Sequence, residues 1–545
     1  MLTYRKLLSI IRGFFYCTLC IIFLSVVMQK GYTVIAYSTP KELREMNTVI
    51  FAYNFAYGNN LYAVSVLDNE IPVATSMYGF LVPLVLSPFI RLLSFTGLNS
   101  LQICELLTLL IELVGAAFFY RIVHRKTGSH LLSAAGMLIF YSCYWRYSFF
   151  AGAFPDQWGL TLSVALMDIL YFDEEKHHYR PAIYAILLVL SFYIKQYFAC
   201  ITIGLCVYLF VYSKKDFKKL LLYGMGLGII SVFLVHLIFP LYFSEAFSIG
   251  QGQAITIDWG YSLMQIKRLS IHYGYIMIFF VIGIFINCYS VITKKQFIGE
   301  VSYELCQIIF ILPLLIYLAR NQGTIYSYYL QLWYPYIILY SMASIPVVAK
   351  RIAPIQTKNV RIIFTVLTYM LVALTVKNVM FSDASSSEVM TPAALPTFQG
   401  DLMTEEQTEA WDRAYNILAQ CATEGDILVS MHLTEYCIEN NIETSNYGQA
   451  EFNDDRNLQN FRNSSLWNNV FLFKYGEEII QNNITYNKKV KENINNHKYR
   501  CIASVYAKEY GLTEEDFANA GYRVLAEEEL MTGKQCWNTT FYVLP

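Results

Sequence analysis

The sequence predicts an all-α polytopic membrane protein up to about residue 380, followed by a smaller α/β domain. Composition is the first reason, because the 545 residues are 56% hydrophobic and 15% charged, with a mean hydropathy of +0.39. That is too apolar for an assembly of soluble domains. The second reason is the recurrence of apolar runs of about 20 residues, the length that a helix needs to cross a bilayer. The third is a change to polar composition after Met380.

Charge excludes one class of partner. The formal net charge is −1, and Lys and Arg occur in short clusters between apolar runs. Such clusters form no continuous basic face, so we expect no nucleic-acid binding. The first apolar run, 14–36, is longer than a signal-peptide core, and no cleavage site of small residues follows it. We therefore expect this run to be retained as a membrane span.

The basic clusters predict the topology, because short loops rich in Lys and Arg face the cytoplasm. Three apolar runs separate the clusters at 5–12 and 121–126, although an even number of crossings is required between them. The middle run, 79–96, contains Pro83, Pro88 and Arg91. We assign it to a helix that lies on the outer surface or re-enters the membrane. The alternative, an ordinary span, would break the pattern of inward-facing basic loops.

This assignment leaves about eleven transmembrane helices, with juxtamembrane helices on the outer side. The N-terminus would be cytoplasmic and the C-terminus extracytoplasmic, as in a multi-pass protein of the cell membrane. The predicted spans are 14–36, 100–120, 131–149, 157–172, 181–194, 196–212, 220–243, 269–292, 302–319, 327–349 and 360–380.

The chain thus divides into a transmembrane domain (1–380), a Ser- and Pro-rich linker (381–402) and an extracytoplasmic α/β domain (403–545). In the last of these we expect helices at 404–420 and 433–440, and strands at 425–431, 469–475, 522–528 and 539–545. An extracytoplasmic position would permit disulfides, and buried free thiols are an equal alternative. The cysteines concerned are Cys421, Cys437, Cys501 and Cys536.

No phosphate-binding loop, zinc-protease motif or nucleophile elbow occurs in the sequence. What recurs is polar side chains at the outer ends of apolar helices. Carboxylates, a lysine, an arginine and tyrosines around one outer vestibule suit acid and base catalysis on a hydroxyl group beside an anionic leaving group. These residues are Glu42, Glu45, Asp156, Lys195, Arg320, Asn321, Tyr328 and Tyr329.

The order of these features resembles the GT-C superfamily of integral membrane glycosyltransferases, in particular its bacterial protein O-mannosyltransferases and aminoarabinose transferases. The resemblance covers roughly residues 1–380 and, more loosely, the rest of the chain. It implies a GT-C-like fold and an inverting transfer of a sugar from a polyprenyl-phosphate carrier to a hydroxyl at the outer face of the membrane. The acceptor would be a lipid, a glycan or a protein.

The resemblance also implies a role for the acidic residues that follow the first span. The catalytic acid of the family precedes a Gly and a Tyr by three to four helical turns. Glu45 stands thirteen residues before Gly58, with Tyr62 beyond it, and so matches this pattern as the general base. Glu42, one turn earlier, is the reserve. The alternative for Glu45 is a solvated carboxylate favoured by a helix dipole.

Pro155 and Asp156 match the second acidic motif of the family, Arg-Pro-Asp, although Phe154 replaces its arginine. By resemblance, Asp156 is a second catalytic residue or a ligand of a divalent metal ion, the one cofactor that the family implies. The alternative is an N-cap for a helix that begins near Gln157. A cap and a ligand are compatible.

Lys195 and Gln196 match the Lys-Gln pair of the family at the tip of a helical hairpin, where the ammonium group holds the carrier phosphate. A straight helix over 181–212 would be too long for one span and would leave Lys195 in hydrocarbon. A hairpin with Lys195 at the surface removes both problems, and snorkelling of the lysine is the alternative. By resemblance, a later outer loop also binds substrate through Arg320, Asn321, Tyr328 and Tyr329. Interfacial tyrosine belts are the common alternative for the tyrosines.

The sequence therefore predicts a glycosyltransferase that depends on a polyprenyl-phosphate sugar. Two readings from other classes remain: a transporter or flippase of lipid-linked glycan, and a non-catalytic scaffold. Transporters often contain internal repeats, and we find none here. Glu105 and Glu112, seven residues apart in one apolar helix, are further functional candidates because acidic groups in a span are costly.

Overall fold

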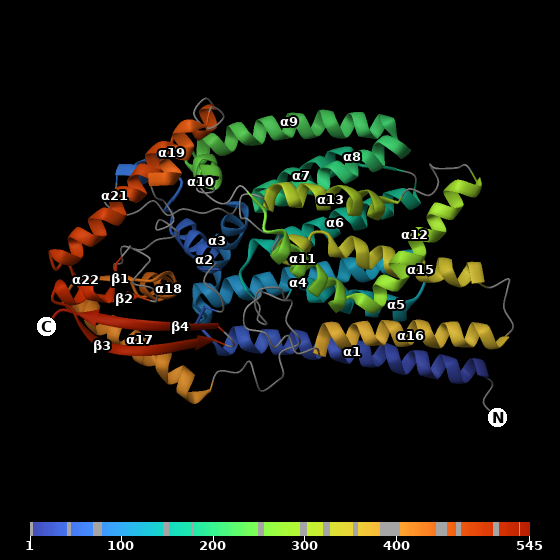
Figure 1. Ribbon diagram of the computed structural model, residues 1–545, viewed down its shortest axis with the longest axis horizontal. Coiled ribbons are helices and arrows are strands. Elements are labelled where there is room, and N and C mark those ends of the chain that lie inside the picture. Colours follow the sequence, from blue (N-terminus) through green and yellow to red (C-terminus); the bar gives the residue numbers. More distant parts are fainter. Residues whose placement is uncertain are drawn as a thin grey trace.

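The computed structural model describes residues 4–40, 45–68, 79–144, 152–176, 178–248, 256–294, 302–319, 327–352, 358–381, 404–442, 455–464, 470–504, 512–532 and 535–545. It consists of a helical region (residues 4–381) and a C-terminal α/β region (residues 404–545). Most of the helices of the first region run roughly parallel to the long axis of the molecule, and the α/β region lies at one end of them (Figure 1). We call this end the sheet end and the opposite one the far end.

Three helices of the described residues have both the length and the apolar composition to cross a membrane. They comprise most of α1 (Tyr4–Ala36) and all of α4 (Ser100–Thr127) and α9 (Lys214–Ile238). Shorter apolar helices pack beside them. The other helices of the region are α2 (Glu45–Ala56), α3 (Leu81–Leu93), α5 (His130–Tyr141), α6 (Pro155–Glu175), α7 (Pro181–Ile194), α8 (Ile201–Tyr212), α10 (Tyr242–Ser248), α11 (Trp259–His272), α12 (Gly274–Lys294), α13 (Tyr303–Ala319), α14 (Ser327–Leu330), α15 (Tyr334–Ile352) and α16 (Lys358–Phe381).

The helix bounds agree with the predicted runs in most places, and the count of eleven crossings stays a prediction. Helix α3 has 13 residues, about 20 Å of helix, which is shorter than a bilayer core. Helices α5 and α8, which were predicted as spans, have 12 residues each, so length does not separate α3 from them and its non-spanning position stays a prediction. The predicted run 327–349 was wrong as a single helix, because α14 ends at Leu330 and α15 begins at Tyr334. The run 269–292 was wrong for the same reason, because α11 ends at His272 and α12 begins at Gly274. Tyr273, between them, packs its ring against Tyr334 at 4.7 Å.

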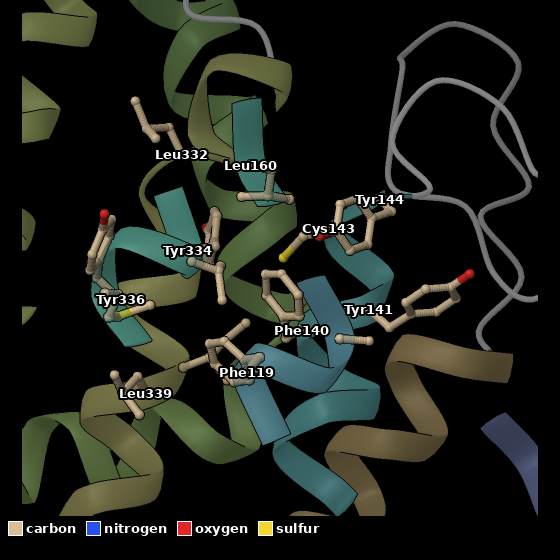
Figure 2. Packing of buried hydrophobic residues seen from close by; sticks show 14 of the residues in the cluster. Phe119, Phe140, Tyr141, Cys143, Tyr144, Leu160, Leu332, Tyr334, Tyr336 and Leu339 are labelled. Atoms are coloured by element: carbon tan, nitrogen blue, oxygen red, sulfur yellow. The ribbon is translucent and has the colours of Figure 1, made fainter. Parts of the chain in front are cut away.

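The core of the helical region is rich in aromatic residues (Figure 2). Phe119 of α4 stacks on Phe140 of α5, with ring centroids 4.4 Å apart and planes 9° apart. Tyr144 meets Phe140 edge-on at 5.2 Å, and its hydroxyl shares a 2.7 Å hydrogen bond with Thr161 of α6. Ring pairs of this kind contribute about 0.5–1.5 kcal/mol beyond their buried area, so they fix the relative positions of α4, α5 and α6.

A buried ion pair connects α1 to α4. Lys30 Nζ lies 2.7 Å from Glu112 Oε2, and the two side chains are 2% and 0% exposed. Tyr141 of α5 donates its hydroxyl to the same carboxylate at 3.0 Å. Glu112, a functional candidate in the sequence, is therefore the acceptor of a structural contact between three helices. Its partner Lys30 had not been predicted.

Lys30→Met is expected to lower the free energy of unfolding by about 3–5 kcal/mol, because it leaves the Glu112 carboxylate buried without a cation. Thermal unfolding in nanodiscs measures the loss. The double variant Lys30→Met/Glu112→Gln removes both charges and keeps an acceptor for Tyr141, so it should recover most of the stability. If Lys30→Met is as stable as the wild type, the ion pair between Lys30 and Glu112 contributes nothing to the free energy of unfolding.

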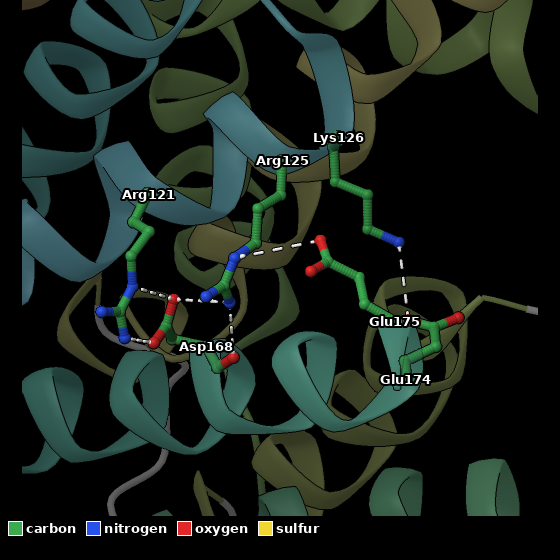
Figure 3. Close-up of polar contacts among 6 residues, drawn as sticks. All are labelled: Arg121, Arg125, Lys126, Asp168, Glu174 and Glu175. Atoms are coloured by element: carbon green, nitrogen blue, oxygen red, sulfur yellow. Dashed lines mark hydrogen bonds and ion pairs between the residues drawn. The ribbon is translucent and has the colours of Figure 1, made fainter. Parts of the chain in front are cut away.

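At the far end, a second polar network joins α4 to α6 (Figure 3). Asp168 is fully buried and accepts hydrogen bonds from Arg121, at 2.9 Å, and from Arg125, at 3.2 Å. Around it, Lys126 lies 3.9 Å from Glu174, and Arg125 lies 3.9 Å from Glu175. The basic cluster that predicted a cytoplasmic loop is thus paired with acids of the neighbouring helix.

The C-terminal α/β region contains one mixed sheet in the order β1-β2-β4-β3. β1 runs parallel to β2, and β4 runs antiparallel to both β2 and β3. The strands are β1 (Asp426–Val429), β2 (Tyr499–Ser504), β3 (Arg523–Thr532) and β4 (Gln535–Val543). The helices are α17 (Glu405–Glu424), α18 (Met431–Glu439), α19 (Asp455–Asn463), α21 (Gly476–Asn495) and α22 (Glu514–Asn519).

Alternation along the strands divides the core of this region between the two faces of the sheet. Cys501 and Ala503 pack with α17 and α18, whereas Ile502, between them, packs with α21 and α22. This is the period of two expected for a sheet covered on both sides. The strands predicted at 425–431, 522–528 and 539–545 are confirmed as β1, β3 and β4.

The strand predicted at 469–475 was wrong. Residues Phe471–Phe473 form a short 3₁₀-helix, η9, and α21 begins at Gly476. Strand β2 and helix α21 had not been predicted. The linker predicted at 381–402 lies, apart from its first residue, outside the described residues. Cys421, Cys437 and Cys501 are buried free thiols, and Cys536 is exposed and free.

Candidate active site

The site is built at the sheet end, starting from the short helix α2. Ten of its twelve residues are buried, because it packs against α3, α4 and α18. It ends before Gly58, whose φ of 87° is the left-handed conformation that commonly stops a helix. Glu45 is the first residue of α2 and is 0% exposed. The alternative of a solvated carboxylate was therefore wrong. Glu42 lies outside the described residues.

The carboxylate of Glu45 is held by a backbone amide from a distant segment. Its Oε2 accepts a 3.1 Å hydrogen bond from the Ala153 N–H. The adjacent Gly152 leaves space for this contact, since a Cβ there would lie 2.3 Å from the Phe154 ring and 3.3 Å from Glu45 Oε2. A hydrogen bond from an amide stabilises the charged form of a carboxylate. This contact fixes the position of the Glu45 carboxylate at the start of α2.

Asp156 follows three residues after Ala153, as the second residue of α6. Phe154 occupies the N-cap position, so the prediction of Asp156 as the N-cap was wrong. Its carboxylate instead faces Lys195, whose Nζ lies 2.9 Å from Oδ2 and 3.1 Å from Oδ1. The Tyr197 hydroxyl also donates to Oδ1. Asp156, Lys195 and Tyr197 together form what we call the ammonium cluster.

Lys195 lies at the predicted break between two helices. Helix α7 ends at Ile194, Lys195 has extended backbone angles (φ −164°, ψ 128°), and the 3₁₀-helix η4 (Gln196–Cys200) follows. The Gly79 N–H donates to the Ile194 carbonyl at 3.1 Å. A Cβ at Gly79 would lie only 1.7 Å from the Tyr193 carbonyl oxygen, so glycine is required for this approach.

The exposure of Lys195 differs from the prediction. The hairpin was expected to place its ammonium at the surface, but the residue is 7% exposed. Burial of a lysine is costly unless it is paired, and Asp156 supplies the counter-charge. The break in the helix therefore turns Lys195 toward α6 rather than toward solvent.

A second tyrosine packs against the ammonium cluster. Tyr329, a predicted site residue, is 6% exposed and meets the Tyr197 ring edge-on at 5.5 Å. Tyr197 had not been predicted as a site residue. Its position two residues after Lys195 in the sequence is the feature that could have indicated it. Gln196 is half-buried in η4. The structure thus brings Asp156, Lys195 and Tyr329 together.

Other predicted site residues lie elsewhere or are not described. Tyr62 is fully buried in an aromatic cluster, with its ring 5.0 Å from Phe51 and 5.6 Å from Tyr242. Arg320 and Asn321 lie outside the described residues, and so does the side chain of Tyr328. Their roles stay predictions.

One short segment connects Glu45 to the ammonium cluster. Ala153 contacts Glu45 and Asp156 contacts Lys195, and three residues of chain span no more than about 11 Å. The two ends of the segment 153–156 therefore contact a carboxylate, Glu45, and an ammonium group, Lys195.

The donor set does not fit a metal ion at Asp156. Among the described residues, no three His, Cys, Asp or Glu side chains are grouped so that they could hold one. The two oxygens of Asp156 already face the Lys195 ammonium and the Tyr197 hydroxyl. The cation that balances Asp156 is thus a lysine of the chain itself.

Helix α4 begins beside this site with an unusually complete cap. Asn99 Oδ1 accepts from the Gln102 N–H at 2.8 Å, and Gln102 Oε1 accepts from the Asn99 N–H at 3.1 Å. The first amides of a helix have no intrahelical partners. This capping box gives partners to the amides of Asn99 and Gln102. The amides between them find partners in the C-terminal region.

The carboxylates of α18 bind these two remaining amides. Glu439 accepts from the Ser100 N–H at 2.7 Å, and Glu435 accepts from the Leu101 N–H at 3.4 Å. Negative charge at a helix N-terminus is favourable. The α/β region is therefore bound to the helical region by charge-assisted hydrogen bonds, which no sequence pattern had indicated.

The same interface extends to α2. The Tyr53 hydroxyl donates to the Ile438 carbonyl at 3.3 Å. Burial, together with the nearby Glu439 carboxylate, raises the pKa of Tyr53 to about 12. The hydroxyl is thus protonated, and able to donate, over the physiological pH range. Helix α18 also packs against α2, the helix that begins at Glu45, so α18 borders the Glu45 side of the site.

Glu439→Gln is expected to weaken the docking of α18 by about 1–2 kcal/mol, since it removes a charge from a hydrogen bond at a helix N-terminus. The amides at residues 100–101 should then exchange with solvent about tenfold faster. Hydrogen–deuterium exchange measures this. The control is Glu477→Gln, which breaks an exposed pair with Arg462 and should leave these amides unchanged. Equal exchange in both variants would contradict the docking role.

Comparison with known proteins adds evidence on the fold. No protein-family model matches the sequence, and no curated protein matches it. Among solved structures, the crystal structure of ArnT from Cupriavidus metallidurans bound to undecaprenyl phosphate is similar, with a TM-score of 0.53 and 11% identity over 96% of this chain and 97% of that chain. The Archaeoglobus fulgidus oligosaccharyltransferase, in complex with zinc and sulfate, gives a TM-score of 0.43 and 10% identity over 96% of this chain and 74% of that chain.

The likeness to ArnT confirms the GT-C-like fold that the sequence resemblance implied, over nearly the whole of both chains. The apolar helices and this fold are those of an integral membrane protein. The small mixed sheet at the C-terminus is part of the same architecture.

Proposed function

We propose that the protein is an inverting glycosyltransferase that moves a sugar from a polyprenyl-phosphate carrier to an acceptor hydroxyl at the outer face of the membrane. The observation that carries this proposal is the buried ammonium of Lys195, paired with Asp156. Asp156 lies three residues after Ala153, whose amide binds the Glu45 carboxylate. The fold shared with ArnT, whose structure contains undecaprenyl phosphate, supports the class of donor.

In this mechanism Glu45 is the general base. It takes the proton of the acceptor hydroxyl as that oxygen forms a bond to the anomeric carbon of the donor sugar. The bond from that carbon to the phosphate oxygen breaks, and its electron pair leaves with the polyprenyl phosphate. A phosphate is a stable anion at neutral pH, so one base and a cationic site for the leaving group are sufficient.

Lys195 supplies the cationic site. The phosphate of the carrier displaces Asp156 as the partner of the ammonium, and the Tyr197 hydroxyl keeps the Asp156 carboxylate in a hydrogen bond. A low-dielectric site strengthens such a contact. Arg320, which follows α13, is assigned to the same phosphate on the basis of the family resemblance.

The test is transfer by the purified protein. The full-length chain in nanodiscs is incubated with radiolabelled polyprenyl-phosphate sugars and with a panel of lipid, glycan and peptide acceptors. We expect one donor to lose its sugar to one class of acceptor, with inversion at the anomeric carbon. Translocation of lipid-linked glycan across proteoliposomes without transfer would instead favour a flippase. Binding of carrier without either reaction would favour a scaffold.

A further inference from the structure

The 3₁₀-helix η9 of the C-terminal region packs against the long apolar helix α9 and against α10. The sequence around it, "VFLFKY" from Val470 to Tyr475, is the most apolar stretch before α21. The strand prediction at this place was wrong, so the apolar run has no role in the sheet. Its three consecutive large apolar residues therefore need another explanation.

Two of the three residues fix η9 to the helical region. The Leu472 carbonyl accepts a 3.3 Å hydrogen bond from the Ser244 hydroxyl of α10. Phe473 meets the Phe247 ring at 5.8 Å. Leu472 and Phe473 both pack against a buried cluster that includes Val235 of α9. These contacts hold the position of η9 relative to α9.

The third residue, Phe471, points away from that cluster. Its ring meets His236 edge-on at 5.3 Å and stacks near Phe233 at 6.3 Å, both on α9. Even so, 53% of Phe471 is exposed. Among the described residues of the α/β region, the only other large hydrophobic side chains exposed to this extent are Val524 and Leu525 of β3.

The surface that Phe471 joins is a lipid-facing one. Only 6% of the membrane-spanning window of α9 is buried inside the protein. Phe233, Leu237 and Ile238, at its end nearest η9, are 61%, 79% and 55% exposed. A helix of this composition is stable only where hydrocarbon covers that face. Phe471 continues the apolar surface of α9 onto the C-terminal region.

The residues after Phe471 have the chemistry of a membrane interface. Lys474 is exposed, and its ammonium lies 4.4 Å from the centre of the Tyr475 ring. Aromatic rings with an adjacent lysine are typical of the boundary between hydrocarbon and headgroups, where the ring is buried and the ammonium meets phosphate.

We propose that Phe471 inserts into the bilayer at the end of α9, and that the partner of this surface is phospholipid. The C-terminal region is then attached to the membrane itself as well as to the helical region through α18. Phe471 enters the outer part of the hydrocarbon, and Lys474 faces the lipid phosphates. This attachment is independent of the catalytic proposal, because it requires no substrate.

The experiment places a photoreactive group at three positions of the full-length protein in vesicles of phosphatidylethanolamine and phosphatidylglycerol. p-Benzoylphenylalanine replaces Phe471, Phe233 or Val524 in separate variants. Phe233 is the positive control within α9. Val524 is the matched negative control, since it is 52% exposed against 53% for Phe471 and lies in β3, away from α9 (Figure 1). After irradiation, mass spectrometry counts lipid adducts.

We expect lipid adducts at 233 and 471, at a yield several-fold above that at 524. A yield at 471 no higher than at 524, with adducts at 233, would overturn the proposal. Hydroxyl-radical footprinting of the unmodified protein gives a second measurement that does not depend on a variant. There Phe471 should be protected from oxidation in vesicles, and oxidation of Phe471 to the extent expected from its 53% exposure would also overturn the proposal.

Discussion

Glu45→Gln is expected to lower the rate of sugar transfer by about 10²-fold or more, the usual contribution of a general base. The amide oxygen of Gln can still accept from the Ala153 N–H, so the fold and the binding of the carrier should persist. What is lost is the capacity to take a proton. Single-turnover transfer and carrier binding, measured separately in nanodiscs, distinguish this loss of chemistry from a loss of affinity.

The matched control is Glu42→Gln, three residues earlier in the sequence, which should reduce transfer much less. If Glu45→Gln transfers sugar at a near-native rate, the general-base role is wrong. If Glu42→Gln is the inactive variant instead, the helical register inferred from Gly58 was one turn out. Hydrogen–deuterium exchange of the α2 amides, which should be the same in both variants as in the wild type, checks that α2 is folded.

Lys195→Met should have two separable effects. It removes the cation that we assign to the carrier phosphate, so binding should weaken by at least about tenfold. It also leaves the buried Asp156 carboxylate without its counter-charge, which typically costs about 3–5 kcal/mol of stability. Thermal unfolding and carrier binding, measured on the same preparation, report the two effects.

The double variant Lys195→Met/Asp156→Asn separates them. The amide that replaces the Asp156 carboxylate is neutral and can still accept from the Tyr197 hydroxyl, so stability should return toward the wild-type value. Carrier binding should stay weak, because the ammonium is still absent. Recovery of both properties in the double variant would show that Lys195 serves only to balance Asp156.

The helical region could be predicted largely from the sequence, because its signals are local. Apolar runs indicated the helix positions, and one charge inside such a run located the break at Lys195. The strand error at 469–475 has a physical cause. A short apolar run is typical both of a buried strand and of a segment that packs against a membrane helix, and η9 is the latter.

The candidate site was predicted in part, because its contacts are not local. Glu45 and Ala153 are 108 residues apart, and Lys195 and Asp156 are 39 apart. The residue types indicated the chemistry but not which side chains pair with one another. The ammonium of Lys195 was therefore expected at the surface, and its burial against Asp156 followed only from the packing of α6 against α7.

The cap of α4 has a consequence for biosynthesis. The partner of the Ser100 amide lies 339 residues later in the chain, and that of the Leu101 amide lies 334 later. Chains are synthesised from the N-terminus, so the ribosome has finished the helical region before Glu435 and Glu439 exist. A nascent or truncated chain would have an open helix start beside Glu45 until α18 arrives. The start of α4, and helix α2 that begins at Glu45, would thus reach their final packing only after α18 has been synthesised.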